Sequence, residues 1–260
     1  MDIFHSIILG IVEGVTEFLP VSSTGHLILA SSLLHIPESA FLKSFEIVIQ
    51  LGAILSVIVV YWKKLWNWEM IKKLLVAFIP TGIIGLALYK IVKTYLMGST
   101  TIVLWSLALG GICLIVFEMW YKKKPLSELQ ESDEISYKQA AIIGTFQSLA
   151  IIPGVSRSAS TIVGGLLLGL TRTTIVEFSF LLAVPTMLAA SGLDLVKNYS
   201  IFSMDQFGVL AVGFIVSFLV ALGSIKFLLQ YIRKHDFIPF GIYRILLASV
   251  FAIIFWKTLL

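Results

Sequence analysis

Charge and cysteine are both scarce in this sequence. Only 13% of its 260 residues are charged, whereas 58% are hydrophobic, and long apolar runs recur along the whole chain. This composition excludes an ordinary water-soluble domain and predicts an all-α, multi-pass membrane protein. The single cysteine, Cys113, lies in an apolar run. No disulfide or zinc framework can therefore be built from cysteine, and we expect Cys113 to be a packing residue.

The basic residues also lack the arrangement that nucleic-acid binding requires. The net charge is only +4, and the lysines cluster in short segments instead of forming a stripe with interleaved aromatic residues. We therefore expect no nucleic-acid partner and interpret the lysines as topology signals. The N-terminal segment lacks a basic region and a small-residue cleavage site, and its apolar stretch carries Glu13 and Glu17. We expect it to belong to the mature fold and not to be a signal peptide.

Six apolar segments are long enough to span the hydrocarbon of a bilayer, which takes about 20 helical residues. They lie near 41–62, 72–94, 100–120, 174–195, 206–230 and 238–259. Two further apolar regions, 3–36 and 138–170, are each broken by Pro and Gly within a hydroxyl-rich patch, from Pro20 to Gly25 and from Pro153 to Ser160. Unpaired backbone at membrane depth must line a cavity or be buried in protein. Each broken region therefore predicts a re-entrant helical hairpin, with two kinked spans as the alternative.

The two broken regions align without a gap at an offset of 134 residues. At this offset Gly10 falls on Gly144, Glu13 on Gln147 and Ser22 on Ser156. The chain then divides into halves 1–120 and 138–260, each a hairpin followed by three spans, joined by the charged loop 121–137. Because three is odd, the second half must be inverted. Inverted repeats with broken helices bind ligands where the breaks meet, so one membrane domain with one central site is predicted.

The distribution of basic residues predicts the orientation of the chain. One side of the predicted topology holds eleven: Lys63, Lys64, Lys72, Lys73, Lys122, Lys123, Lys124, Lys138, Arg172, Arg233 and Lys234. The other side holds five: Lys43, Lys90, Lys93, Lys197 and Lys257. Since cytoplasmic loops are richer in Lys and Arg, we expect the first side to be cytoplasmic. Both termini and the mouth of the first hairpin, with the site it carries, would then face the outside.

Two acidic residues in the first broken region have the spacing of a helical pair. Glu13 and Glu17 are four residues apart, so on a helix their Cβ atoms lie about 6 Å apart. Two carboxylates that close repel each other unless a cation or a proton joins them. Oxygen ligands suit a divalent cation, Mg²⁺ or Ca²⁺. Glu46 and Gln50 repeat this spacing and are possible participants. The alternative for Glu13 and Glu17 is a pair of acids that face a water-filled vestibule and only solubilise it.

A run of hydroxyls follows the first break. Ser22, Ser23 and Thr24 lie where the second helix of the hairpin should begin, so they can cap it and help its amides bind an anion. His26 follows Ser23 by three residues, a spacing that allows proton exchange between a nucleophile and a base. A core histidine bonded to a backbone carbonyl is the alternative for His26.

The second break places an arginine among hydroxyls. Arg157 lies within Pro153 to Thr161, which also contains Gly154, Ser156, Ser158 and Ser160. An arginine at membrane depth is costly unless it meets an anion, and its planar fork suits phosphate oxygens. An ion pair with one of the acids could coexist with that role in the empty site. The acids considered are Glu13, Glu17, Glu46 and Glu177, the last of which is expected to be a structural partner.

Three segments resemble the signature motifs of the bacterial undecaprenyl-diphosphate phosphatase family. They are EGVTEFLPVSSTGH at 13–26, FEIVIQLG at 45–52 and PGVSRSAST at 153–161. The resemblance covers essentially the whole chain, and no motif position departs from the family pattern. It implies hydrolysis of undecaprenyl diphosphate to undecaprenyl phosphate, which recycles the lipid carrier for cell-wall synthesis and lowers sensitivity to bacitracin. The expected partners are a polyprenyl diphosphate and membrane lipids, and a homodimer stays open.

The resemblance, joined to the residue chemistry, predicts a mechanism. Arg157 would hold the phosphate oxygens, and Glu13 with Glu17 would hold the metal. Ser23 would attack the terminal phosphorus while His26 handles its proton; a water activated by Glu17 or by the metal is the alternative nucleophile. The supporting substrate-binding residues would be Ser22, Thr24, Gly154, Ser156, Ser158 and Thr161.

Two other classes of protein share some of these features. A transporter of an anionic lipid or of phosphate would share the inverted repeat and the anion site, but it would release no phosphate. The type-2 phosphatidic acid phosphatases use a histidine nucleophile downstream of a Ser-Arg motif. Here the only histidine after Arg157 is His235, which lies far outside that spacing, so that chemistry is disfavoured.

Overall fold

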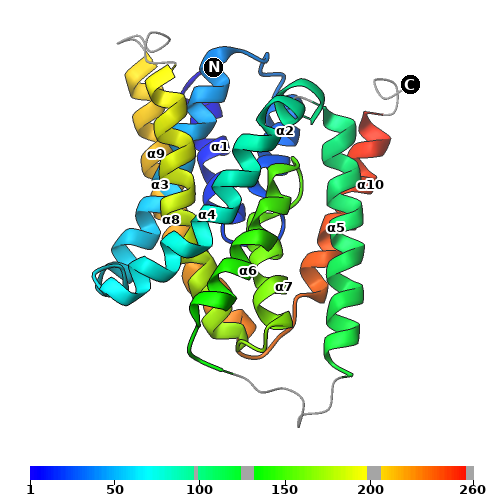
Figure 1. The fold of residues 1–260 in the computed structure, drawn as a ribbon. Coiled ribbons are helices and arrows are strands. Elements are labelled where there is room, and N and C mark those ends of the chain that lie inside the picture. The colour runs from blue at the N-terminus through cyan, green and yellow to red at the C-terminus, as the bar shows by residue number, and fades with distance from the viewer. Residues whose placement is uncertain (97–98, 124–131, 198–205, 256–260) are drawn as a thin grey trace.

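The protein is built from helices (Figure 1). The computed structural model describes residues 1–96, 99–123, 132–197 and 206–255. Its helices are α1 (Ile3–Thr16), α2 (Ser23–Leu33), α3 (Ala40–Leu65), α4 (Trp68–Ile91), α5 (Thr100–Tyr121), α6 (Tyr137–Gln147), α7 (Arg157–Leu167), α8 (Arg172–Lys197), α9 (Phe207–Ile232) and α10 (Ile238–Ile254), with a π-helical turn η1 (Val92–Leu96) and a 3-10 turn η3 (Ser148–Ile151). The described residues contain one isolated β-bridge, between Ser132 and Leu170. The predicted all-α fold is confirmed.

Within the described residues, five helices are long and apolar enough to cross a membrane. They are α3, α4, α5, α8 and α9, with mean hydropathies from 1.6 to 2.4. Large apolar side chains cover their outer faces, such as Leu86 at 76% and Trp105 at 64% exposure, which suits contact with lipid tails. The sixth predicted span, 238–259, begins as α10, which has 17 residues; positions 256–260 lie outside the described part. The chain is a multi-pass membrane protein.

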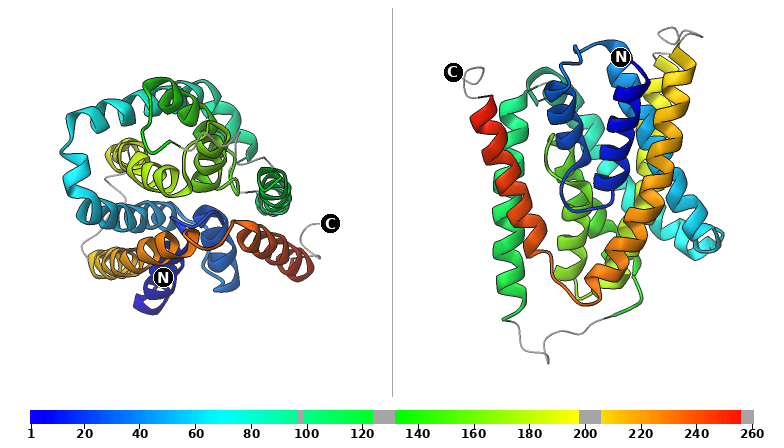
Figure 2. Two further views of the ribbon diagram at one scale, coloured as in Figure 1. Left: turned by 90° about the horizontal axis from the view of Figure 1, so that it is seen from below. Right: turned by 180° about the vertical axis from the view of Figure 1, so that it is seen from behind.

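Each broken region forms a helical hairpin. In Figure 2 (right), α1 runs from the N-terminus toward the middle of the bundle and α2 returns to the same end. The pair α6 and α7 enters from the opposite end (Figure 1). The non-helical breaks, 17–22 and 152–156, begin and end earlier than the sequence predicts. Ser23 and Arg157 already belong to helices, because Ser22 and Ser156 cap them.

The packing pairs follow the 134-residue offset. Helix α1 packs on α9, and its counterpart α6 packs on α4, the counterpart of α9. Both contacts are close because a glycine lies at each. A Cβ on Gly10 would come within 2.9 Å of the Gly213 carbonyl oxygen, and one on Gly144 within 1.8 Å of the Ala77 carbonyl oxygen. The division into inverted halves stays a prediction, with this packing in its favour.

Ion pairs join the chain segments at the end opposite the N-terminus. Arg172 binds the buried carboxylate of Glu118 through two hydrogen bonds, of 2.5 and 2.8 Å. Lys64 pairs with Glu177. Glu177 is thus a structural partner, as the sequence predicts, but its partner is Lys64 and not Arg157. Among the described residues, these paired groups have partners at this end of the bundle and form no ion pair with the hairpin turns.

The expectation that Cys113 packs inside the protein is wrong. Its side chain is exposed on α5. Helix α5 packs mainly against α10 at one side of the bundle, so much of its apolar surface faces outward (Figure 2, left). An apolar run therefore did not distinguish a core position from a lipid-facing one.

The close contact between α6 and α4 gives a testable prediction. We expect Gly144→Ala to push α6 away from α4 and to lower the free energy of unfolding by about 1–3 kcal/mol, the usual cost of overpacking. The measurement is thermal unfolding of the purified protein in detergent. Gly223→Ala on α9 is the control, since a Cβ there meets nothing within 4 Å. Equal unfolding temperatures for the two variants would contradict the contact.

Candidate active site

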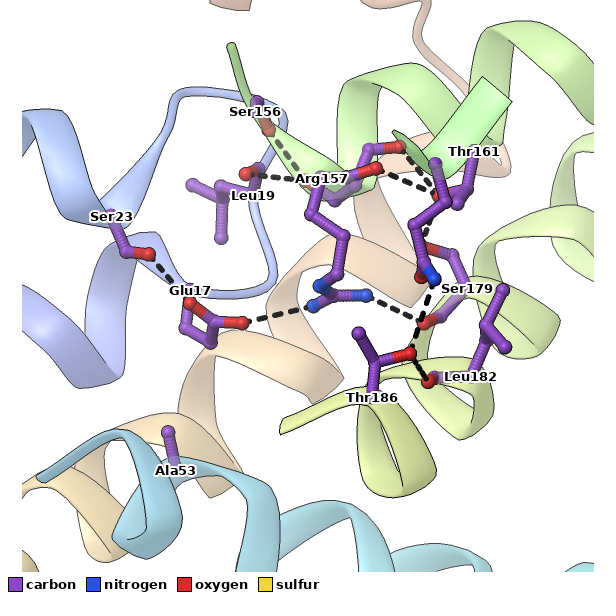
Figure 3. Close-up of polar contacts among 12 residues, drawn as sticks. Glu17, Leu19, Ser23, Ala53, Ser156, Arg157, Thr161, Ser179, Leu182 and Thr186 are labelled. Carbon is purple, nitrogen blue, oxygen red and sulfur yellow. Dashed lines mark hydrogen bonds and ion pairs between the residues drawn. The ribbon is translucent and has the colours of Figure 1, made fainter. Parts of the chain in front are cut away.

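The two hairpin turns meet at the carboxylate of Glu17 (Figure 3). The hydroxyl of Ser23, the first residue of α2, donates to Glu17 Oε2 at 2.5 Å. The guanidinium of Arg157, the first residue of α7, donates to Glu17 Oε1 at 3.0 Å. Glu17 is therefore the acid, among those that the sequence offered, with which Arg157 pairs. One carboxylate joins the predicted nucleophile to the predicted phosphate-binding cation.

Local sequence places these residues at the starts of helices. The Ser22 hydroxyl accepts a hydrogen bond from the Gly25 amide at 3.4 Å, and the Ser156 hydroxyl accepts one from the Ala159 amide at 3.2 Å. Ser22 has a φ of 73°, a conformation that is costly for a residue with a side chain and typical of functional turns. The positive ends of the α2 and α7 dipoles consequently lie at the same place, which favours an anion.

Arg157 is held from two directions. Besides its bond to Glu17, its Nη1 donates to the Ser179 carbonyl on α8 at 2.7 Å (Figure 3). Its Nε is buried and has no hydrogen-bond partner. A guanidinium that is fixed at both terminal nitrogens, with its Nε–H unpaired, is suited to an incoming oxyanion.

The remaining hydroxyls of the second hairpin hold the turns. Ser158 donates to the Leu19 carbonyl at 2.8 Å, which links the second hairpin directly to the first turn. Thr161 bonds to the Ser179 hydroxyl at 2.6 Å and so anchors α7 to α8. The structure thus uses Ser158 and Thr161 for positioning, whereas Ser22, Thr24, Gly154 and Ser156 line the cavity described next.

A cavity of about 410 Å³ opens beside Glu17, Ser23 and Arg157. Part of its wall is apolar and includes Ile151, Ile152 and Met187. Gln50 lines the cavity too, while Glu46, one turn earlier on α3, does not. A cavity with one charged, hydrogen-bonding side and one apolar side can receive an amphiphile whose head is anionic.

Three further polar residues of the cavity wall were not predicted from the sequence. Gln147 Nε2 donates to the hydroxyls of Thr81 at 2.9 Å and Thr186 at 3.1 Å, and all three line the cavity. Two signals were available. Each threonine directly follows a proline inside an apolar span, Pro80 and Pro185, and the repeat alignment places Gln147 opposite Glu13.

His26 has different partners from those its spacing suggests. Its Nδ1 bonds to the Ser22 carbonyl at 2.7 Å, and its Nε2 bonds to the hydroxyl of Tyr243 on α10 at 2.8 Å, with the two rings stacked. Both ring nitrogens are therefore engaged, and the Ser23 hydroxyl bonds to Glu17 instead. Nothing in the sequence pointed to Tyr243, 217 residues away.

Comparisons with known proteins place the chain in a family. The model described as "Bacitracin resistance protein BacA" matches residues 6–250. The chain belongs to the BacA family. Its relatives include proteins named undecaprenyl-diphosphatase from Sulfurihydrogenibium sp., 52% identical over 96% of this chain and 98% of the relative, and from Wolinella succinogenes, 54% identical over 96% and 97%. A third, from Aquifex aeolicus, is 49% identical over 98% and 99%. The resemblance inferred from the three motifs is confirmed.

In this BacA family member, Glu13 is a buried acid with unpaired oxygens. It is fully buried one turn from Glu17, and neither of its carboxylate oxygens has a hydrogen-bond partner. Within the described residues no group of three or more His, Cys, Asp and Glu side chains could hold a metal ion. The protein would therefore supply two carboxylates, and phosphate and water oxygens the rest, as is usual for Mg²⁺. The donor chemistry of the two carboxylates suits a divalent cation, and Mg²⁺ or Ca²⁺ stays a prediction.

The contrast between the two acids predicts unequal effects on stability. Glu13→Gln exchanges one buried, unpaired polar group for another, so we expect the free energy of unfolding in EDTA to change by less than about 1 kcal/mol. Glu17→Gln breaks the buried pair with Arg157, and we expect a loss of about 3 kcal/mol. Unfolding of both variants in detergent is the measurement. A destabilised Glu13→Gln variant would mean that Glu13 has a partner in the folded protein.

Proposed function

We propose that this chain hydrolyses undecaprenyl diphosphate to undecaprenyl phosphate and inorganic phosphate, and so recycles the lipid carrier of cell-wall synthesis and contributes to bacitracin resistance. Membership of the BacA family and full-length relatives named undecaprenyl-diphosphatase support this function. The observation in the structure that carries it is the convergence of Ser23 and Arg157 on Glu17 beside a cavity with an apolar wall.

The substrate would lie with its head among the two turns and its tail along the apolar wall. The diphosphate meets the guanidinium of Arg157 and the starts of α2 and α7, which together offset its negative charge. The prenyl chain passes Ile151, Ile152 and Met187 toward the lipid. Because Arg157 is already oriented by Ser179, it loses little freedom when phosphate binds.

Glu17 would accept the proton of the attacking group. In the first step the Ser23 oxygen forms a bond to the terminal phosphorus, its proton passes to Glu17, and undecaprenyl phosphate leaves with the electrons of the broken P–O bond. Water then attacks the phosphoserine and releases inorganic phosphate. If water attacks directly, Glu17 takes the proton of that water and Ser23 positions the phosphate. His26 would support the start of α2 through Ser22 and Tyr243.

A divalent cation would be held by Glu13 and Glu17. Bound there, Mg²⁺ or Ca²⁺ supplies positive charge that offsets the charge of the phosphate oxygens. Arg157 and the amides of the two turns provide the remaining positive potential from the chain itself.

We propose further that the cavity faces the outside of the cell, as the count of basic residues predicts. The N-terminus and the last turn of α10 lie at one end of the bundle (Figure 1), and the ion-paired segments around Lys64, Lys122 and Arg172 lie at the other. With the second end in the cytoplasm, the first hairpin enters the membrane from outside.

Phosphate release tests the function. We expect purified protein in detergent to release phosphate from a C55 prenyl diphosphate, and Arg157→Lys to lower kcat more than tenfold, because a point charge cannot replace a fork held by two acceptors. Arg233→Lys, at an exposed position at the end of α9, is the matched control and should keep wild-type turnover. A wild-type protein that binds the lipid but releases no phosphate would overturn the function and favour transport.

Metal removal tests the role of the two acids. We expect exhaustive dialysis against EDTA to lower turnover at least tenfold, and added Mg²⁺ or Ca²⁺ to restore it. In Glu13→Gln, restoration should need a higher metal concentration, because one carboxylate ligand is gone. Full turnover after dialysis, with metal absent by elemental analysis, would remove the cation from the proposal.

Cysteine labelling tests the orientation. In a Cys113→Ala background, a cysteine replacing Glu38, exposed between α2 and α3, should react with an impermeant maleimide added to intact cells. A cysteine replacing the exposed Glu134, before α6, should react only after the cells are opened. The reverse pattern would place the cavity on the cytoplasmic side.

A further inference from the structure

Helix α10 carries an arginine that the proposed mechanism does not use. Arg244 is 1% exposed at membrane depth, and in the described part of the chain its guanidinium has no carboxylate partner. Its hydrogen bonds go to backbone carbonyls instead. They reach Ser106 at 2.9 Å, Gly154 at 3.0 Å, Leu107 at 3.3 Å and Pro20 at 3.5 Å.

Two of these carbonyls belong to the two hairpin turns, at equivalent positions. Pro20 and Gly154 are related by the same 134-residue offset that aligns the broken regions. Three residues after each carbonyl comes a residue of the site, Ser23 in one hairpin and Arg157 in the other. One guanidinium thus bonds to both turns, in each case three residues before the group that contacts Glu17.

The counterpart of Arg244 under this offset is Gly110 on α5. A Cβ on Gly110 would lie 2.2 Å from Nη2 of Arg244. The space between the halves therefore holds one arginine side chain, and the equivalent position must leave room for it. The repeat is therefore not kept at this pair of positions, where Arg244 bonds to the turns of both halves and Gly110 leaves space for it.

A buried cation without a counter-ion is costly unless its hydrogen bonds are satisfied. Four hydrogen bonds to carbonyls from three segments of the chain meet that need. The two bonds to Pro20 and Gly154 also give a donor to turn carbonyls that have no helical partner at membrane depth. The neighbouring Tyr243 bonds to His26 in the first turn of α2, so α10 contacts the first hairpin at two points.

We propose that Arg244 is a positioning residue of the phosphatase. It ties the two hairpin turns together and thereby sets the position of Ser23 relative to Arg157. This role rests on the proposed function but does not require contact with substrate. Loss of the tie should misplace the reacting groups, which lowers kcat, while the apolar wall that holds the lipid tail stays intact, which leaves KM nearly unchanged.

Two variants test the role in different ways. Arg244→Lys keeps the charge but cannot reach four carbonyls. Gly110→Ala keeps the arginine and displaces the end of its flexible side chain from them. For both we expect kcat to fall at least tenfold and KM to change less than threefold.

Matched controls separate positioning from general packing. Gly223→Ala adds a Cβ on α9 where nothing lies within 4 Å, and Arg172→Lys weakens a partly buried arginine pair far from the turns. We expect the first to behave as wild type. The second should lower the unfolding temperature while kcat of the folded protein stays within twofold.

Hydrogen–deuterium exchange gives a measurement that needs no turnover. Exchange in segments 17–24 and 153–158 should be faster in Gly110→Ala and Arg244→Lys than in wild type, with segment 215–230 of α9 unchanged. If Arg244→Lys does not fold, Gly110→Ala decides.

Unchanged exchange in both turns, or a kcat within twofold of wild type, would overturn the positioning role. A rise in KM at constant kcat would also overturn it. Wild-type protein that releases no phosphate would refute the proposed function alone, since exchange still tests the tie.

Discussion

The carboxylate of Glu17 bonds at once to the first residue of α2 and to the first residue of α7. Without this contact, the buried guanidinium of Arg157 would be held only by the Ser179 carbonyl. The contact also joins the turns of two hairpins that enter from opposite ends of the bundle. A buried ion pair is retained where its geometry is satisfied on both sides, and here each carboxylate oxygen has one donor. The same contact brings a hydroxyl, a base and a cation to one cavity, which is what phosphoryl transfer needs.

The broken helices create both the site and the need to hold it. Each break frees backbone groups that lipid cannot satisfy. The chain satisfies them with its own side chains: Ser22 and Ser156 cap the new helices, Ser158 bonds to the Leu19 carbonyl, and Arg244 bonds to Pro20 and Gly154. The hydroxyl-rich composition of the breaks thus has two uses. Some hydroxyls line the cavity, and others replace the hydrogen bonds that a continuous helix would have made.

Local spacing in the sequence predicted much of this architecture. Proline and glycine inside apolar runs predicted both hairpins, and the arginine among hydroxyls predicted a cation at the break, which the structure places against Glu17 beside the cavity. The predicted boundaries of the breaks lie a few residues too late in the sequence, because a serine shortly after a proline can equally lie in the turn or cap the next helix. Only the capping bonds of Ser22 and Ser156 decide this.

Contacts between distant segments could not be predicted in this way. The three-residue spacing of Ser23 and His26 suggested a nucleophile with its base, but Tyr243 and the Ser22 carbonyl take both ring nitrogens. Helical spacing gives proximity along one helix and says nothing about a partner on another. Arg244 was overlooked for the same reason, since an arginine near the start of an apolar span is usually a topology signal and its acceptors lie 90 to 224 residues away.

A double-mutant cycle on Ser23 and Glu17 tests the central claim most directly. The account predicts that Ser23→Ala and Glu17→Gln each lower kcat for phosphate release by more than a hundredfold, and that the double variant is scarcely slower than the slower single variant, because the two residues act as a unit. His26→Ala should cost less than either. Losses that multiply in the double variant, or a Glu17→Gln enzyme that keeps a tenth of wild-type turnover, would contradict the account.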